Sequence, residues 1–215
     1  MNPDQFIRDN TELVTPPPVP ELRLHLASEV VPLWRKTEAE LNRSGIAPPY
    51  WAFAWPGGQA LARHILDHPG IVAGRRVLDI GAGSGLVAIA AARAGASQAI
   101  AAEIDPVAGA AIALNAALNG AAVAVERDDL IGREGDWEVV LVGDMCYERP
   151  LAERLTAWLR RLAGAGRLVL LGDPGRSYLP RCGLAALACY RVPTSLELED
   201  RDSREATVSR VLAEG

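Results

Sequence analysis

The segment VLVGDMCYERP, residues 140–150, places an aspartate at the end of an apolar run and a tyrosine three positions later. A carboxylate is costly to bury without a partner, so Asp144 needs a hydrogen-bond donor, a cationic ligand or water. Its position therefore suits a group that holds a ligand beside the ring of Tyr147. The structural alternative is that Asp144 caps a helix starting near Arg149, which is a common use of aspartate.

Acidic residues also stand at or next to the ends of the other short apolar runs from Arg76 onward. In an open α/β sheet, ligands bind beyond the carboxyl ends of the parallel strands. We therefore expect these acids to converge on one crevice. They are Asp79, Glu103, Asp105, Asp128, Asp129 and Asp173.

The first run leads into a glycine turn, DIGAGSG, which contains Gly81, Gly83 and Gly85. A dinucleotide fingerprint needs glycine where Leu86 stands, and no Gly-Lys-Ser/Thr closes the turn as it would in a P-loop. Asp79 at the turn would repel a pyrophosphate but would favour a ligand that carries ammonium and sulfonium charges. S-adenosylmethionine is such a ligand. The alternative is a tight strand-to-helix turn without a ligand.

Glu103 stands 22 positions after Gly81. This is close to the spacing of about 20 at which a carboxylate at the end of the second strand accepts both ribose hydroxyls. Asp128 and Asp129 end the third strand and then fall beside the adenine, where one of them can accept from the exocyclic amine. For at least one of the two we expect only a solvated loop start. The strand, turn, helix and acid together favour the cofactor over a bare turn.

The apolar runs around these residues are apolar on both faces, as central parallel strands must be. Segments of helical length lie between most of them, so strand and helix alternate. This order predicts a doubly wound, Rossmann-like α/β fold with a mostly parallel sheet. The expected strands are residues 76–81, 98–105, 122–129, 137–144 and 166–173, and the expected helices are residues 86–95, 106–120 and 149–165.

Further segments flank this core. Residues 189–200 and 205–213 alternate in hydropathy like a hairpin, which would suit an antiparallel edge of the sheet. Residues 1–20, which end in TPPPVP, are predicted to form an extended lead-in. We expect one domain over residues 21–215, divided into an N-terminal extension, residues 21–70, and the Rossmann-like core, residues 71–215.

Within the extension, Leu22, Leu24 and Leu26 alternate with other residues as in a strand. A helical pattern over residues 32–45 ends at a glycine, and a second helix is expected to begin near Gln59.

The formal net charge of −5 and the isoelectric point near 5.3 disfavour a broad basic face for nucleic acid or anionic lipid. No stretch reaches the roughly 20 apolar residues of a membrane span, and the first ten residues contain charges where a signal peptide has an apolar core. We expect a soluble, cytoplasmic protein that binds neither nucleic acid nor membrane.

The three cysteines and three histidines lack the spacing of metal ligands, so no metal site is expected. Cys146, Cys182 and Cys189 are an odd number in a chain expected inside the cell. We predict free, mostly buried thiols.

At the level of motifs, the chain resembles the class I, seven-β-strand S-adenosylmethionine-dependent methyltransferases, through VLDIGAGSGLVAIAAA and AEIDP. More narrowly, it resembles the electron transfer flavoprotein β-subunit lysine methyltransferases. The segments that carry this resemblance cover almost the whole chain after Pro16. They are LRLHLA, PYWAFAWPGGQALAR, VLDIGAGSG, EIDPVA, GDMCYE and GDPGRSYLP.

This resemblance implies a seven-stranded sheet and a protein-lysine N-methyltransferase whose substrate is the electron transfer flavoprotein β-subunit. It implies that Asp144 orients the lysine nitrogen, that Tyr147 walls the lysine channel and that Trp55 lies over the cofactor. Trp51, Asp173 and Arg176 are expected to border the acceptor. Relatives frequently have aspartate where this chain has Glu103, though either acid can hold a ribose.

Each of these assignments has a structural alternative: the two tryptophans are by default core aromatics, and Asp173 can belong to a turn. A different acceptor, such as a ribosomal protein or a small amine, remains the first alternative for the function. A non-catalytic cofactor-binding domain is the second.

Overall fold

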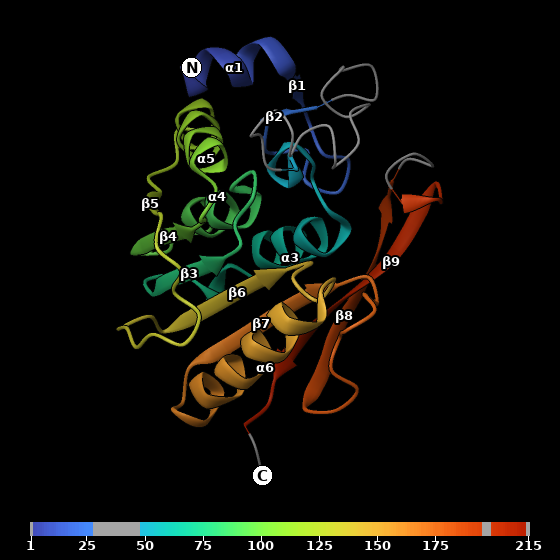
Figure 1. The fold of residues 1–215 in the computed structure, drawn as a ribbon. Coiled ribbons are helices and arrows are strands. Elements are labelled where there is room, and N and C mark those ends of the chain that lie inside the picture. Colours follow the sequence, from blue (N-terminus) through green and yellow to red (C-terminus); the bar gives the residue numbers. More distant parts are fainter. Residues whose placement is uncertain (1, 28–47, 195–198, 214–215) are drawn as a thin grey trace.

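The computed structural model describes residues 2–27, 48–194 and 199–213. The main sheet in this part of the chain contains β3 (Arg76–Ile80), β4 (Gln98–Ala102), β5 (Ala124–Glu126), β6 (Val139–Gly143), β7 (Leu168–Asp173), β8 (Leu184–Pro193) and β9 (Ser203–Val211). Its order is β5-β4-β3-β6-β7-β9-β8 (Figure 1). The strands from β5 to β7 run parallel, whereas β9 is antiparallel to both β7 and β8. The predicted seven-stranded, mostly parallel sheet with an antiparallel edge hairpin is confirmed.

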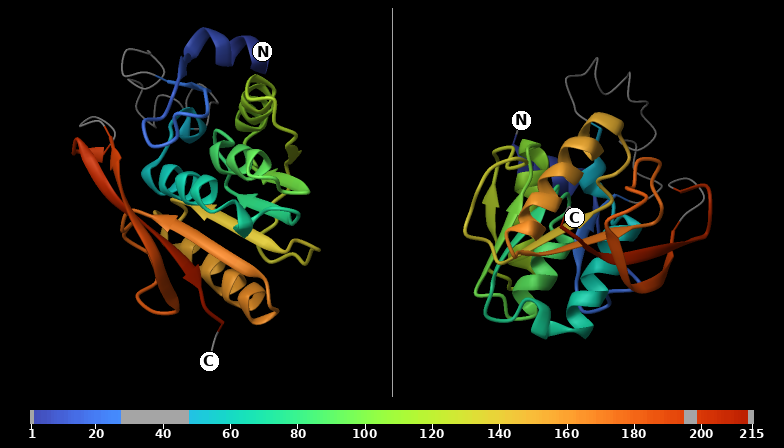
Figure 2. Two further views of the ribbon diagram at one scale, coloured as in Figure 1. Left: turned by 180° about the vertical axis from the view of Figure 1, so that it is seen from behind. Right: turned by 90° about the horizontal axis from the view of Figure 1, so that it is seen from below.

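The helices that cover the sheet are α3 (Pro56–Asp67), α4 (Leu86–Arg93), α5 (Pro106–Leu118) and α6 (Arg149–Gly164). The first three lie on one face and α6 lies on the other (Figures 1 and 2). Val139 and Leu141 of β6 accordingly pack into the core under α3, whereas Val140 and Val142 pack into the core under α6. Successive side chains of a strand point to opposite faces, so a strand covered on both faces must be apolar throughout.

The chain order of the parallel strands reverses beside β3. From β3 the chain builds outward through β4 to β5 and then returns to place β6 on the other side of β3. Neighbouring loops leave in opposite directions at such a point, which opens a crevice beyond the carboxyl ends of the strands.

The N-terminal residues pack on the core instead of forming an extended lead-in. Residues 3–10 form the helix α1 (Pro3–Asn10), in which Asn2 caps the N–H of Asp4 at 3.0 Å and Ile7 is fully buried. The prediction for residues 1–20 was therefore wrong at this helix. The signal that it missed is an asparagine cap followed by proline in the first turn.

The strand predicted around Leu24 is confirmed. β2 (Leu24–Leu26) pairs in antiparallel sense with β1 (Glu12–Val14), and both leucines of β2 are buried. The helix expected near Gln59 begins three residues earlier, at Pro56, because proline fits the first turn. The helix expected over residues 32–45 lies outside the described residues, and the division of the chain at residue 21 stays a prediction.

The cysteines differ in part from the prediction. All three are free, but only Cys146 is buried, whereas Cys182 and Cys189 are exposed. Cys189 lies on β8 at the edge of the sheet, where one face meets solvent. In the described part of the chain, no helix is long and apolar enough to cross a membrane, and His, Cys, Asp and Glu side chains form no group of three that could hold a metal ion.

Candidate active site

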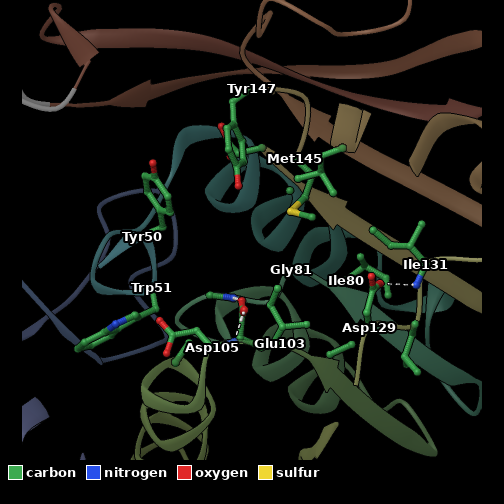
Figure 3. A pocket seen from close by; sticks show the side chains of 18 of the residues that line it. Tyr50, Trp51, Ile80, Gly81, Glu103, Asp105, Asp129, Ile131, Met145 and Tyr147 are labelled. Carbon is green, nitrogen blue, oxygen red and sulfur yellow. Dashed lines mark hydrogen bonds between the residues drawn. The ribbon is translucent and has the colours of Figure 1, made fainter. Parts of the chain in front are cut away.

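A pocket of about 640 Å³ lies beyond the carboxyl ends of β3, β4 and β6, at the point where the strand order reverses (Figure 3). Most of the residues predicted for the site line it. They are Trp51, Trp55, Gly81, Gly83, Glu103, Asp128, Asp129, Asp144, Tyr147 and Arg176. Asp79, Gly85 and Asp173 are outside this lining.

The glycine turn forms one wall of the pocket. Gly81, Gly83 and Gly85 have φ values of 63°, 53° and 82°, in the left-handed region that favours glycine. The N–H of Gly81 donates to the carbonyl of Ala102 at 3.0 Å, which ties the turn to the end of β4. A left-handed residue at Gly85, the N-cap of α4, turns the chain into the helix. The turn therefore leaves backbone, without side chains, facing the pocket at Gly81 and Gly83.

Glu103 lies beside this turn at the end of β4. Its Oε2 accepts the N–H of Gly83 at 3.0 Å, and its Oε1 accepts the N–H of Asp105 at 3.1 Å. Burial raises the pKa of Glu103, and these backbone N–H groups oppose the rise. A carboxylate has about four lone-pair sites, so each oxygen can still accept from a ligand.

Asp79 lies beneath the turn. It is 2% exposed, and its Oδ2 accepts the N–H of Ala88 in the first turn of α4 at 3.0 Å. Burial raises the pKa of Asp79 to about 8. The side chain therefore connects β3 to α4 and supports the turn from below, and direct contact with the cofactor stays a prediction for this residue.

Asp128 and Asp129 lie at the rim and are paired with arginines. Asp128 contacts Arg133 at 2.9 Å, and Asp129 contacts Arg154 at 2.6 Å. Oδ1 of Asp129 also accepts the N–H of Ile131 (Figure 3). Both carboxylates are exposed enough to accept further hydrogen bonds, and which of them meets the adenine stays a prediction.

Asp144 faces the pocket from the end of β6. It has a φ of 56° and a relative exposure of only 7%. Its Oδ2 accepts the N–H of Gly58 at 2.9 Å, and its Oδ1 accepts from Nη2 and Nε of Arg176 at 2.8 and 3.2 Å. Burial raises its pKa to about 7, although the charge of Arg176 opposes this rise. The N-cap position of α6 is Glu148, so Asp144 does not cap that helix.

Arg176 belongs to a network of four charged side chains. Besides Asp144, it contacts both carboxylate oxygens of Glu199, through Nη2 at 2.6 Å and Nη1 at 3.2 Å. Glu199 in turn accepts from Nε of Arg204 at 3.0 Å. The guanidinium of Arg176 also lies 5.4 Å from the ring centroid of Trp55. Arg176 therefore joins the pocket to the end of the β8–β9 hairpin.

Asp173 forms a turn at the end of β7. Its Oδ1 accepts the N–H groups of Gly175 and Arg176, both at 2.7 Å. This geometry is that of an aspartate turn and holds Arg176 in place. Direct contact between Asp173 and a substrate stays a prediction.

Aromatic side chains flank the entrance. Tyr50 and Tyr147 are 48% and 46% exposed, and their ring centroids are 5.8 Å apart (Figure 3). The ring of Trp55 lies 6.2 Å from that of Tyr50. Trp51 is only 3% exposed and packs in a core cluster with Ile7, so it serves at least in part as a core aromatic residue.

Comparison with known proteins separates the two halves of this site. The model of the ribosomal protein L11 methyltransferase (PrmA) family matches residues 61–142, which include the glycine turn and Glu103 but end before Asp144. The electron transfer flavoprotein beta subunit lysine methyltransferase of Xenopus laevis is 45% identical over 213 residues, which cover 96% of this chain and 85% of that protein. The chain belongs to this family. The Danio rerio member is 40% identical over 95% of this chain and 81% of its own length.

Solved structures share the fold of this methyltransferase. Magnesium protoporphyrin IX methyltransferase from Synechocystis PCC 6803, with bound S-adenosylhomocysteine, has a TM-score of 0.54 at 18% identity, over 73% of this chain and 81% of that one. The ribosomal protein L11 methylase of Lactobacillus delbrueckii has a TM-score of 0.51 at 22% identity, over 74% and 81%. The chain is thus an S-adenosylmethionine-dependent lysine methyltransferase with the class I fold.

The pocket of the methyltransferase fits S-adenosylmethionine. Glu103 provides a largely buried carboxylate whose remaining lone pairs suit ribose hydroxyls. Leu130 and Ile131 provide an apolar wall next to Asp128 and Asp129. The glycine turn offers backbone without side chains, so that a ligand can approach closely.

Several residues of the methyltransferase site were not predicted from the sequence. Glu199 is one of them, because nothing near it in sequence marks it as a partner of Arg176. Tyr50 is a second, although the Pro-Tyr-Trp stretch beside Trp51 contains it. The third group is a set of glycines at which α3 touches the sheet: Gly57, Gly58, Gly143 and Gly172. The Pro-Gly-Gly at the start of α3 was a signal for this close approach.

Proposed function

We propose that this enzyme transfers a methyl group from S-adenosylmethionine to a lysine ε-amino group in the β-subunit of an electron transfer flavoprotein. The observation that carries the proposal is that Asp144, at the end of β6, lines the same pocket as Glu103 and the glycine turn. One pocket thus combines residues suited to bind the cofactor with a carboxylate suited to orient the acceptor lysine. The family of the chain supports the choice of acceptor.

On the cofactor side, Glu103 accepts the two ribose hydroxyls while Gly83 and Asp105 hold its carboxylate in place. Asp128 or Asp129 accepts from the adenine amine. Trp55 lines the pocket, and its Nε1 donates to the carbonyl of Tyr50 at 2.8 Å.

On the acceptor side, Asp144 orients the lysine nitrogen. Arg176 donates twice to Oδ1, whereas Oδ2 accepts one N–H, from Gly58. A carboxylate oxygen offers two lone pairs, so Oδ2 retains one for the acceptor amine. Methyl transfer is a displacement in line, so its rate depends chiefly on this alignment and on the electrostatic environment.

The lysine must react as a neutral amine, which is scarce at neutral pH because the unperturbed pKa of lysine is about 10.4. When bound, S-adenosylmethionine supplies an electrophilic methyl group on a positively charged sulfur. Asp144 then stabilises the ammonium of the product, with which it forms a charge-assisted hydrogen bond. The pKa of Asp144, near 7, leaves much of it charged at neutral pH. We assign it orientation and charge stabilisation, and the proton leaves to water.

Tyr147 walls the channel through which the lysine side chain enters. It is half-exposed and borders the pocket two residues after Met145. The face of an aromatic ring attracts a methylated ammonium by cation–π interaction. Trp51, Asp173 and Arg176 support the acceptor side through packing, the β7 turn and the bond to Asp144. The cytoplasmic location, and the absence of nucleic-acid and membrane partners, stay predictions.

The acceptor is tested by offering labelled S-adenosylmethionine and purified enzyme three substrates in parallel: electron transfer flavoprotein, ribosomal protein L11 and free lysine. We expect label in a lysine of the flavoprotein β-subunit, located by mass spectrometry, and none with the Asp144→Asn variant above a small residual level. Label in ribosomal protein L11 alone, or in free lysine alone, would replace the proposed acceptor. Tight cofactor binding without transfer to any of the three would support the non-catalytic alternative.

A further inference from the structure

Arg176 is held by two carboxylates that come from different elements and occupy adjacent edges of its guanidinium. Nε and Nη2 donate to Asp144, and Nη1 and Nη2 donate to Glu199. A guanidinium is a rigid planar fork, so two carboxylates that share its edges determine its orientation. The position of Asp144 Oδ1 therefore depends on what holds the adjacent edge of Arg176, formed by Nη1 and Nη2.

Glu199 is suited to hold this edge of Arg176 because it is buried and paired with two arginines. Its side chain is 2% exposed, although it lies next to the exposed residues of the β8–β9 connection. Burial of a carboxylate is unfavourable unless it is paired, and Glu199 is paired with both Arg176 and Arg204. Arg204 contacts it twice, through the Oε2 bond at 3.0 Å and through a bond from Nη2 to its carbonyl oxygen at 3.2 Å. Arg204 thus anchors Glu199 to β9.

The charges in this network affect Asp144 as well. If Arg176 paired with Asp144 alone, the guanidinium would neutralise the carboxylate that is to meet the lysine. Because Glu199 shares the same guanidinium, Asp144 keeps more negative potential toward the pocket. The two carboxylates and two arginines together are neutral, which is compatible with their burial.

We propose that Glu199 is a positioning residue for methyl transfer, which acts by holding the Nη1 and Nη2 edge of Arg176 so that Asp144 presents Oδ2 to the acceptor amine. This inference rests on the proposed function, because it assumes that Asp144 serves the acceptor. It assigns a role to a residue at the end of the β8–β9 hairpin that does not itself line the pocket.

The first test compares Glu199→Gln and Glu199→Asp with Glu205→Gln, which changes an exposed glutamate of the same hairpin. We expect Glu199→Gln to lower kcat by about 10- to 100-fold, as small misplacements of reacting groups do. KM for the acceptor protein and the affinity for S-adenosylmethionine, measured by calorimetry, should change by no more than about twofold. The substitution disturbs an alignment needed in the transition state and leaves the binding of both substrates in the ground state unchanged. Glu199→Asp should recover part of kcat, and Glu205→Gln should match wild type.

The second test asks whether Glu199 acts through Arg176. In an Arg176→Lys background, which already lacks the planar fork, Glu199→Gln should lower kcat no further, because residues that act as one unit are not additive. An equal further loss in that background would overturn the proposal, as would wild-type kcat in folded Glu199→Gln. If Glu199→Gln does not fold, Arg204→Lys loosens the same carboxylate from its other side and should lower kcat in the same selective way. Wild-type kcat in folded Arg204→Lys and Glu199→Asp would then overturn the inference.

Failure of the inference is distinguishable from failure of the proposed function. Full activity in Asp144→Ala would remove the acceptor role of Asp144 itself and with it the basis of the inference. An inactive Asp144→Ala together with a fully active Glu199→Gln would remove only the role of Glu199.

Discussion

The N–H of Gly58 donates a 2.9 Å hydrogen bond to Oδ2 of Asp144, although 86 residues separate the two in the chain. The bond forms because α3 meets β6 and β7 at glycines, which let the two backbones approach closely. Gly58 lies in the first turn of α3, whose N–H groups have no partner within the helix. A carboxylate satisfies one of them and is favoured there by the helix dipole. The end of β6 and the start of α3 thus position Asp144 together.

Gly57→Ala should therefore damage both the fold and the activity. A Cβ at this position would lie 2.6 Å from Oδ2 of Asp144 and closer still to the carbonyl oxygen of Gly172. We expect a loss of about 1–3 kcal/mol in the free energy of unfolding, as for other overpacked sites, and a loss of methyl transfer. Urea denaturation and a transfer assay measure the two effects. Gly70→Ala is the matched control, because a Cβ there has no neighbour within 4 Å; equal behaviour of the two variants would contradict the close approach.

Asp144→Ala should separate cofactor binding from turnover. We propose that this carboxylate serves the acceptor and that Glu103 holds the cofactor, so most of the affinity for S-adenosylmethionine should remain. Methyl transfer should fall by orders of magnitude, because alignment and electrostatic stabilisation each contribute several kcal/mol, roughly, to such reactions. Calorimetry and a transfer assay on the same preparation show whether the two separate.

Asp144→Asn distinguishes orientation from charge. Asparagine keeps the size and one acceptor oxygen but loses the charge that pairs with Arg176 and that we propose stabilises the product ammonium. Near-full activity in Asp144→Asn with an inactive Asp144→Ala would assign the residue an orienting role alone. Full activity in both variants would show that Asp144 only supports the start of α3.

Glu103→Ala should weaken cofactor binding. The variant removes the proposed acceptor for the ribose hydroxyls and also frees the N–H groups of Gly83 and Asp105. Loss of a charge-assisted pair of hydrogen bonds corresponds to about 2–3 kcal/mol, or some tens-fold in dissociation constant. Calorimetry with S-adenosylhomocysteine measures this without turnover. Glu134→Ala, an exposed acid outside the pocket lining, should bind as wild type does, and an unchanged affinity in Glu103→Ala would remove the ribose assignment.

Asp79→Asn should reduce the dependence of stability on pH. Burial raises the pKa of Asp79 from 3.8 to about 8 in the folded protein, so between these values the folded state binds more protons than the unfolded state. The contribution of this group is therefore fully present at low pH and is lost as pH rises toward 8, at up to about 1.4 kcal/mol per pH unit. Asparagine can still accept the N–H of Ala88 but does not ionise.

Denaturation of wild type and Asp79→Asn at pH 5 to 8 measures the difference in slope. Some slope should remain in the variant, because burial also raises the pKa of Asp144 and Glu103. Parallel curves for the two proteins would show that Asp79 does not hold its proton in the folded state.

Much of the fold could be predicted from the sequence, because its signals are local. The continuous apolar runs of β3 and β6 identify strands covered on both faces, and the glycines at 81, 83 and 85 mark a turn that side chains would hinder. α1 was missed because proline-rich sequence nearby suggested extended chain, whereas the cap at Asn2 decides the local structure.

The residues on the cofactor side of the site could also be predicted from the sequence. Glu103 follows Gly81 at a spacing set by one helix and one strand, so its place beside the turn follows from the chain itself. Asp144 is comparable, because the end of an apolar run is visible in the sequence. The sequence could not tell which acids face the pocket, because a strand end is followed by a turn whose dihedral angles decide the direction of the side chain. Asp144 enters the pocket with a φ of 56°, whereas Asp79 and Asp173 turn to backbone N–H groups of their own loops and helices.

The sequence by itself thus determined the order of strands and helices, the glycine turn and the acids at the strand ends, since each depends on residues close together in the chain. Only the tertiary structure decided how Asp144 is held. Its partners Gly58 and Arg176 come from α3 and from the turn after β7, and Glu199 reaches Arg176 from the hairpin. These contacts depend on the packing of separate elements. No pattern in the sequence indicates which charged residues, far apart in the chain, will pair. The reason is physical: a buried charge is stable only with its partner, and the fold as a whole brings the two together.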